Sequence, residues 1–176
     1  MRNSIWALAL VAGIAFTANT PARGDEQMTP LAVSGDWVAF AHRKSMVAAP
    51  DVCMALNEVQ NVAFRASSEA IEFRVSDQKW SLPAHIDGTI LVKVGDWTTS
   101  LGIIFNTDSM VSAIVDREVL LAMFAGMDKS SVMSITVGNS KPRSVSLIGS
   151  SKATNAFRTC VGLHSNDKKA GENPFN

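Results

Sequence analysis

Residues 70–94 read AIEFRVSDQKWSLPAHIDGTILVKV, and this stretch decides the fold class. In residues 70–76 apolar side chains alternate with the charged Glu72 and Arg74, which is the period of two expected of a half-buried strand. Residues 89–94 alternate in the same way, and the Asp87-Gly88 pair before them is typical of a turn. The stretch therefore predicts two strands joined by a connection rich in turn residues.

Short strands and turns continue on both sides of this stretch. The period of two and the turn residues predict further strands at 37–40, 51–58, 97–105, 110–115, 131–137 and 143–148. The GNSKP segment at 138–142 is typical of a hairpin loop, so the last two of these strands should pair with each other.

Two stretches have the spacing of helices instead. The first follows Asp116, which we expect to cap a helix running to about residue 124, with Gly126 ending it. The second should be capped by Ser150 or Ser151, and it places Ala153, Phe157 and Cys160 on one face. We therefore predict an antiparallel β sandwich or open barrel with two short helices.

Composition limits the classes of protein. The chain has 176 residues, enough for one domain, and 47% of them are apolar, which excludes a disordered chain. Its 16 basic and 16 acidic residues balance, whereas proteins that bind nucleic acid normally carry a basic excess. Two cysteines cannot form a four-cysteine zinc site. We expect a single globular domain that does not bind nucleic acid.

The N-terminus resembles a secretory signal. Arg2 precedes an apolar run of 12 residues at 5–16, too short for the roughly 20 residues that span a bilayer. Cleavage after Gly24 is favoured over cleavage after Ala22, and an uncleaved anchor is the alternative. The predicted layout is a signal peptide at 1–24, a flexible lead-in at 25–34, a β-rich domain at 35–163 and a loose tail at 164–176. Such a chain would be periplasmic or secreted, without a stable membrane anchor.

Export would place the two cysteines in an oxidising compartment. Cys53 and Cys160 both lie beyond the expected cleavage site, and an even pair in an oxidising compartment is most simply a disulfide. No C-x-x-C spacing supports a redox-active pair, and two unpaired buried thiols are the other alternative. The bridge would join the start of the domain to its last helix.

No pattern in the sequence indicates catalysis, a metal or a cofactor. His42, His85 and His164 are scattered, and no G-x-S-x-G motif or glycine-rich phosphate loop occurs. Met123 and Met127 lie one helical turn apart, which is more typical of core packing than of copper binding. The start of the last helix, at Ser150, could instead hold an anion.

Three tryptophans are the candidate binding residues. Trp37, Trp80 and Trp97 are the tryptophans of the predicted domain. They could seal the sandwich, or one or two of them could lie exposed as a binding surface.

The second half of the chain resembles the invasion-associated locus B family of exported bacterial proteins. The resemblance rests on VSAIVDREVLLAMFAGMDKSSVMSITV at 111–137 and SVSLIGSSKATNAF at 144–157, with weaker similarity at 35–37, Cys53 and 79–95. The family usually has a cysteine pair before the short helix, where this chain has GIIFNTDSMVSA at 102–113. The resemblance implies a periplasmic or surface-associated β-rich domain linked to host-cell interaction and virulence. It implies no catalytic residues.

These observations favour an exported, non-enzymatic binding or accessory protein whose partner is a protein or another component of the cell envelope. The alternative is a small periplasmic hydrolase or enzyme inhibitor. A polar cleft with converging acid and base groups would favour the enzyme, and an exposed aromatic or apolar patch would favour the binding protein.

Overall fold

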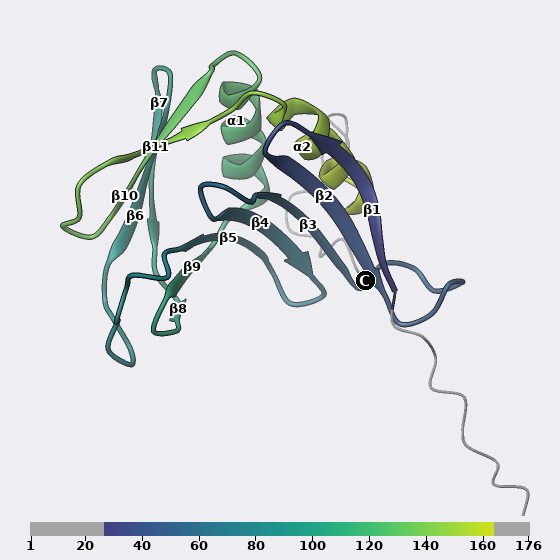
Figure 1. The fold of residues 1–176 in the computed structure, drawn as a ribbon, viewed down its shortest axis with the longest axis horizontal. Coiled ribbons are helices and arrows are strands. Elements are labelled where there is room, and N and C mark those ends of the chain that lie inside the picture. The colour runs from purple at the N-terminus through teal and green to yellow at the C-terminus, as the bar shows by residue number, and fades with distance from the viewer. Residues whose placement is uncertain (1–26, 164–176) are drawn as a thin grey trace, which may run out of the picture.

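Two antiparallel sheets and two helices make up the fold. The computed structural model describes residues 27–163, and in this part the sheets pack as a β sandwich without closing into a barrel (Figure 1). The prediction of a mainly β, antiparallel sandwich with two short helices is therefore confirmed.

The large sheet holds the first half of the domain. Its first five strands follow one another as antiparallel neighbours, and β9 and β8 then extend it at the far side. In spatial order the strands are β1 (Gln27–Ser34), β2 (Trp37–Arg43), β3 (Val52–Asn57), β4 (Val62–Ser67), β5 (Ile71–Ser76), β9 (Met110–Ile114) and β8 (Phe105–Asn106).

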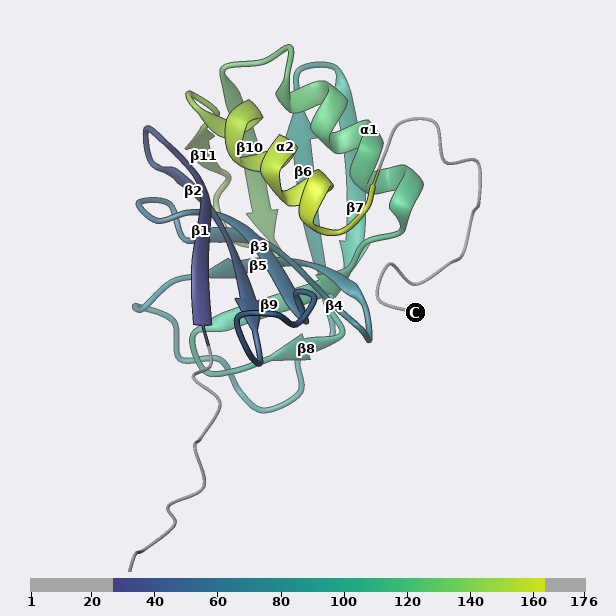
Figure 2. The same cartoon turned by 90° about the vertical axis from the view of Figure 1, so that its right-hand side faces the viewer.

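The small sheet and the helices cover one face of the large sheet. The small sheet has the order β11 (Arg143–Ser146), β10 (Val132–Val137), β6 (Thr89–Val94) and β7 (Trp97–Gly102). Helix α2 (Ser150–Cys160) packs on β1, β2 and β3, and helix α1 (Arg117–Met127) lies between α2 and the β6–β7 hairpin (Figures 1 and 2).

A cluster of four phenylalanines joins these layers. Phe64 of β4 lies 5.2 Å from Phe73 of β5 and 4.8 Å from Phe124 of α1, measured between ring centroids. Phe157 of α2 lies 6.1 Å from Phe124, and all four side chains are fully buried. Aromatic pairs at these distances add to the burial of apolar area, so this cluster fixes both helices on the large sheet.

The predicted disulfide is confirmed. Cys53 of β3 and Cys160, the last residue of α2, are bonded with their Cα atoms 6.1 Å apart and 107 residues apart in sequence. The bridge holds the end of α2 over the large sheet, with Cys53 fully buried and Cys160 partly exposed.

The expectation of a flexible lead-in at 25–34 is wrong for residues 27–34, which form β1. Pro30 lies in this strand, and the pairing of β1 with β2 shifts register between Pro30 and Ala32. An edge strand tolerates a proline because its outer N–H groups need no partner within the sheet. Packing of α2 on β1 stabilises a segment whose sequence pattern is weak.

Both helix boundaries also differ from expectation. The residue before α2 is Gly149, so neither Ser150 nor Ser151 caps that helix, and Gly149 has a φ of 87°. Helix α1 follows Asp116 as predicted, without a side-chain cap bond, but it continues through Gly126 to Met127. Gly126 therefore lies inside the helix instead of ending it.

The predicted signal peptide at 1–24 and the tail at 164–176 lie outside the described residues. Within residues 27–163, no helix has both the length and the apolar character needed to cross a membrane.

Candidate binding groove beside Trp97

The structure separates the three tryptophans named as a possible binding surface. Trp37 is fully buried, and its Nε1 donates a hydrogen bond to the carbonyl oxygen of Ser146 at 2.8 Å. It pairs with buried Asn57 in the sheet register, which puts both side chains on the core face. Trp37 is therefore a core residue, and its assignment to a binding surface is wrong.

Trp80 lies partly buried at the loop between β5 and β6. The guanidinium carbon of Arg143 stands 5.9 Å from its ring centroid, within the range of a cation–π contact. Arg143 also donates to the carbonyl oxygens of Ser76 and Asn61, at 3.1 Å and 3.4 Å. Burial lowers the pKa of Arg143, and the nearby Asp77 charge opposes that effect. Through these hydrogen bonds and its contact with Trp80, the Arg143 side chain joins β11 to the large sheet.

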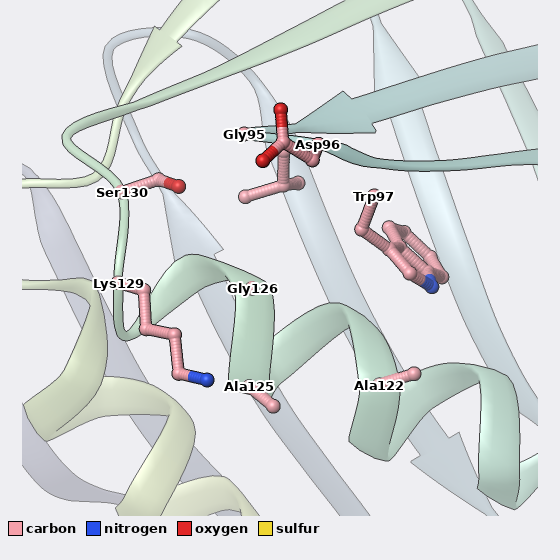
Figure 3. A pocket seen from close by; sticks show the side chains of 9 residues that line it. Gly95, Asp96, Trp97, Ala122, Ala125, Gly126, Lys129 and Ser130 are labelled. Carbon is pink, nitrogen blue, oxygen red and sulfur yellow. The ribbon is translucent and has the colours of Figure 1, made fainter.

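Trp97 forms one side of a surface groove. The groove has a volume of about 480 Å³ and lies between the β6–β7 turn and the outward side of α1 (Figure 3). Its lining combines apolar and small residues with three polar side chains: Val94, Gly95, Asp96, Trp97, Ala122, Ala125, Gly126, Lys129 and Ser130. The structure therefore places Trp97, one of the three predicted residues, at a cavity.

One glycine shapes the wall of this groove at the β6–β7 turn. Gly95 has a φ of 57°, and a Cβ there would stand 3.0 Å from the Oγ of Ser130. The turn and the end of α1 therefore meet in a geometry that favours glycine at position 95. At Gly126 a Cβ would make an ordinary van der Waals contact with the Cβ of Val94, at 3.4 Å, so α1 lies close to β6 there without requiring a glycine.

The charged groups of the groove point in different directions. In Figure 3 the Lys129 amino group lies beside α1, whereas the Asp96 carboxylate points away from the helix. Within the described residues, no carboxylate lies at ion-pair distance from Lys129. The groove thus offers an aromatic wall, an apolar floor, the Lys129 cation beside the helix and the Asp96 carboxylate, which points away from the helix. An apolar ligand carrying negative charge could meet Lys129 on the helix side.

A second hollow of about 440 Å³ lies over the disulfide. Leu31, Pro50, Ala156, Thr159 and Cys160 line it together with Arg43. The Arg43 guanidinium donates to the carbonyl oxygen of Ala48 at 2.7 Å, which ties the loop after β2 to the strand. Its cation is thus engaged within the chain, so this hollow offers less to a ligand than the groove does.

The most connected ionic cluster lies on the outer face of the large sheet. Glu72 accepts bonds from Arg65 at 2.9 Å, from Arg74 at 2.8 Å and from the Ser112 hydroxyl at 2.6 Å. Burial alone would raise the pKa of Glu72, but these hydrogen bonds and the two positive charges outweigh it, so the pKa lies below its ordinary value. The cluster joins β4, β5 and β9, and the charged residues expected on a solvated face are paired there.

The residues considered for metal binding have other surroundings. His42 lies on β2, and its Nδ1 is 2.6 Å from Asp51 Oδ1. Burial alone would raise the pKa of Asp51, but the hydrogen bond and charge interaction with His42 contribute to outweighing it, so the pKa lies below its ordinary value. Met123 and Met127 are buried in the core, and no group of three potential ligands occurs among the described residues.

The helix side of the groove was not predicted from the sequence. Ala122 and Gly126 are spaced by four on α1, so they share one face, and Lys129 follows at the end of that face. A run of small residues on the outer side of a helix was the available signal, but the sequence does not show that the β6–β7 turn lies beside it.

Comparisons with family models, with curated proteins and with solved structures gave no significant match to this chain. The resemblance to the invasion-associated locus B family therefore stays a prediction.

Proposed function

We propose that this chain is an exported, non-enzymatic binding or accessory protein of the bacterial periplasm or cell surface. The groove beside Trp97 carries the binding part of this proposal, because a partly buried indole faces small apolar residues across a cavity of ligand size. The signal-like segment at 1–24 and the Cys53–Cys160 disulfide support export, since disulfides persist in oxidising compartments.

The partner that fits this proposal is a protein or another component of the envelope. A link to host-cell interaction and virulence rests on the family resemblance alone. Hydrolysis or enzyme inhibition is the alternative, and turnover or inhibition by the purified mature protein would favour it.

Photo-cross-linking in bacteria that export the full chain tests the proposal. A photoreactive amino acid replaces Ala122, which is exposed in the groove, and a control variant carries it at Ser144, which is exposed on β11. We expect adducts with an envelope component from position 122 and none from position 144. Equal labelling from both positions, or none from either, would overturn the groove as the binding site.

Fractionation of the same cells tests export. The mature protein should be recovered from the periplasm or the medium, and its N-terminal sequence should begin at about Asp25. A soluble cytoplasmic protein beginning at Met1 would contradict the proposal.

A further inference from the structure

The edge of the small sheet next to the groove is unprotected. β7 has only β6 as a neighbour, so its other side presents backbone N–H and C=O groups that no strand of residues 27–163 pairs with. Its six residues, WTTSLG, include no proline and no charge, and its register with β6 is continuous. Natural edge strands usually carry features that prevent pairing with another chain.

The other three sheet edges do carry such features. β1 holds Pro30 and a register shift, and β8 has only two residues. β11 has four residues, begins with Arg143 and follows Pro142. Among the edges of the described sheets, β7 alone is long, regular and neutral, which is the form that a strand-accepting edge requires.

The register shows which backbone groups of β7 face outward. The Ile103 N–H donates to the Gly88 carbonyl oxygen at 2.9 Å, so odd-numbered residues of this strand point their backbone groups at β6. Thr98 and Ser100 therefore direct their N–H and C=O groups away from the sheet. These are the groups that an added strand would bond.

The groove lies where the side chains of an added strand would go. Trp97 pairs with buried Val94, so its ring projects from the core-side face of the small sheet, toward α1. Alternate side chains of a strand beside β7 would project from that same face, toward the groove between Trp97 and Ala122. Small or branched apolar side chains suit a groove of this size.

The position of Lys129 indicates the direction and charge of such a strand. Antiparallel pairs are commoner than parallel ones, and a strand antiparallel to β7 would run from Gly102 toward Trp97. Its C-terminal end would come to the β6–β7 turn, where Lys129 and Asp96 both line the groove and the Asp96 carboxylate points away from α1. A second copy of β7 holds no carboxylate that could meet this lysine, which favours a different chain.

We propose that β7 receives an extended peptide segment of a partner protein as an added antiparallel strand, whose carboxylate pairs with Lys129. This inference rests on the proposed binding function and names the chemistry of the partner. The carboxylate is either the C-terminus of the partner or an Asp or Glu side chain near the end of the bound segment.

Proline variants at two sheet edges test the strand addition. The probe is a synthetic library of eight-residue peptides with free C-terminal carboxylates, screened against the mature oxidised protein. Ser100→Pro removes an outward N–H while leaving the bonds to β6 intact, and Ser144→Pro does the same on β11. We expect to find peptides whose affinity for the wild type equals their affinity for Ser144→Pro. Their affinity for Ser100→Pro should be lower by about tenfold or more, because edge hydrogen bonds are lost.

Two further arms keep the test decisive. Selected peptides that are N-methylated at alternate residues should lose binding to the unaltered protein, which tests the backbone bonds without any folding risk. Lys129→Gln should lower the affinity for peptides with a free C-terminal carboxylate by about fivefold. Loss on C-terminal amidation assigns the carboxylate to the terminus, and loss on Asp→Asn or Glu→Gln change in the peptide assigns it to a side chain.

Several results would overturn the inference, and they separate it from the proposed function. Peptide binding that ignores both Ser100→Pro and N-methylation, or a library without binders, refutes strand addition. If strand addition is refuted but cross-linking from position 122 succeeds, the proposed binding function holds without strand addition. If cross-linking fails as well, both proposals are refuted. If sedimentation shows a dimer that Ser100→Pro abolishes, the edge binds a second copy of this chain. If Lys129→Gln leaves the affinity for free-acid peptides unchanged, the carboxylate contact is refuted.

Discussion

Gly149 shows how a single backbone position determines the packing of an element. Its φ of 87° is rarely adopted by residues with a side chain, and a Cβ there would lie 2.2 Å from the carbonyl oxygen of Ser34. The start of α2 and the end of β1 therefore meet through a residue that only glycine suits. The sequence contains this glycine, but its spatial neighbour Ser34 is 115 positions earlier in the chain.

Gly149→Ala should lower the free energy of unfolding by about 2–4 kcal/mol, because backbone strain adds to a clash that moves α2 away from β1. Gly138→Ala is the matched control: its φ is 53°, but nothing lies within 4 Å of the added Cβ. The control should cost about 1 kcal/mol, the strain alone. Chemical denaturation measures both, and equal losses would show that the contact with Ser34 contributes nothing.

The lowered pKa of Glu72 predicts that the free energy of unfolding depends on pH. Its pKa in the folded state lies below the ordinary value of 4.5, so its contribution is present at neutral pH and is lost as the pH falls through the folded pKa. Glu72→Gln should destabilise by about 1–3 kcal/mol at pH 7, where two arginines lose their carboxylate. The stabilities of wild type and variant should converge in acid, and a constant difference down to acid denaturation would contradict this account.

At the scale of elements, the strongly alternating segments were predictable and the others were not. β5 and β6 have strict alternation, and both form where expected. The alternation does not predict β4, because its VAFRAS sequence alternates only weakly and the partner of its Arg65 lies on the neighbouring strand, β5. β1 pairs with β2 and also packs against α2, and the second of these contacts joins the two ends of the domain, which no local pattern reveals.

The groove was predictable only in part, for a related reason. Trp97 was a candidate because large aromatic residues stand out in a sequence. Ala122 and Gly126 did not stand out, because small residues on a helix contribute to a site only when another element lies beside them. Trp37 was wrongly included, since its indole N–H has a buried partner, the Ser146 carbonyl, that is 109 residues away.

Helix α2 should contribute much of the stability through one side chain. Phe157 is fully buried and lies 6.4 Å from Phe64 and 6.1 Å from Phe124. Phe157→Ala should therefore cost about 3–5 kcal/mol. Lys152→Ala, at an exposed position of the same helix, should change stability by less than about 0.5 kcal/mol. A loss below about 1 kcal/mol for Phe157→Ala would mean that α2 is not docked on the sheet.

At the scale of the whole molecule, the disulfide closes the domain. It links β3 to the last residue of α2, and α2 in turn packs against α1, which forms the helix side of the groove. The loop that it closes spans most of the described chain. The bridge therefore also supports the helix side of the candidate site, and disulfides of this kind persist in oxidising compartments.

Replacing both cysteines by serine should lower the free energy of unfolding by up to about 4.7 kcal/mol, the value for a loop of roughly 100 residues in the chain-entropy treatment. Urea denaturation of the oxidised protein and the double variant measures the difference. Thiol labelling of protein that is isolated from cells without reductant and then denatured should find no free thiol. Two reactive thiols per chain would refute the bridge in the cell.

Amide hydrogen exchange at β7 tests the central claim most directly, namely that this chain binds a partner through the groove and the strand edge beside it. The mature oxidised protein is measured with and without a saturating peptide from the free-carboxylate library. The account predicts that exchange of the Thr98 and Ser100 amides slows by about tenfold or more on binding, because their N–H groups gain partners, while the Ser144 amide is unchanged. Bound peptide with unchanged exchange at both Thr98 and Ser100 would contradict it.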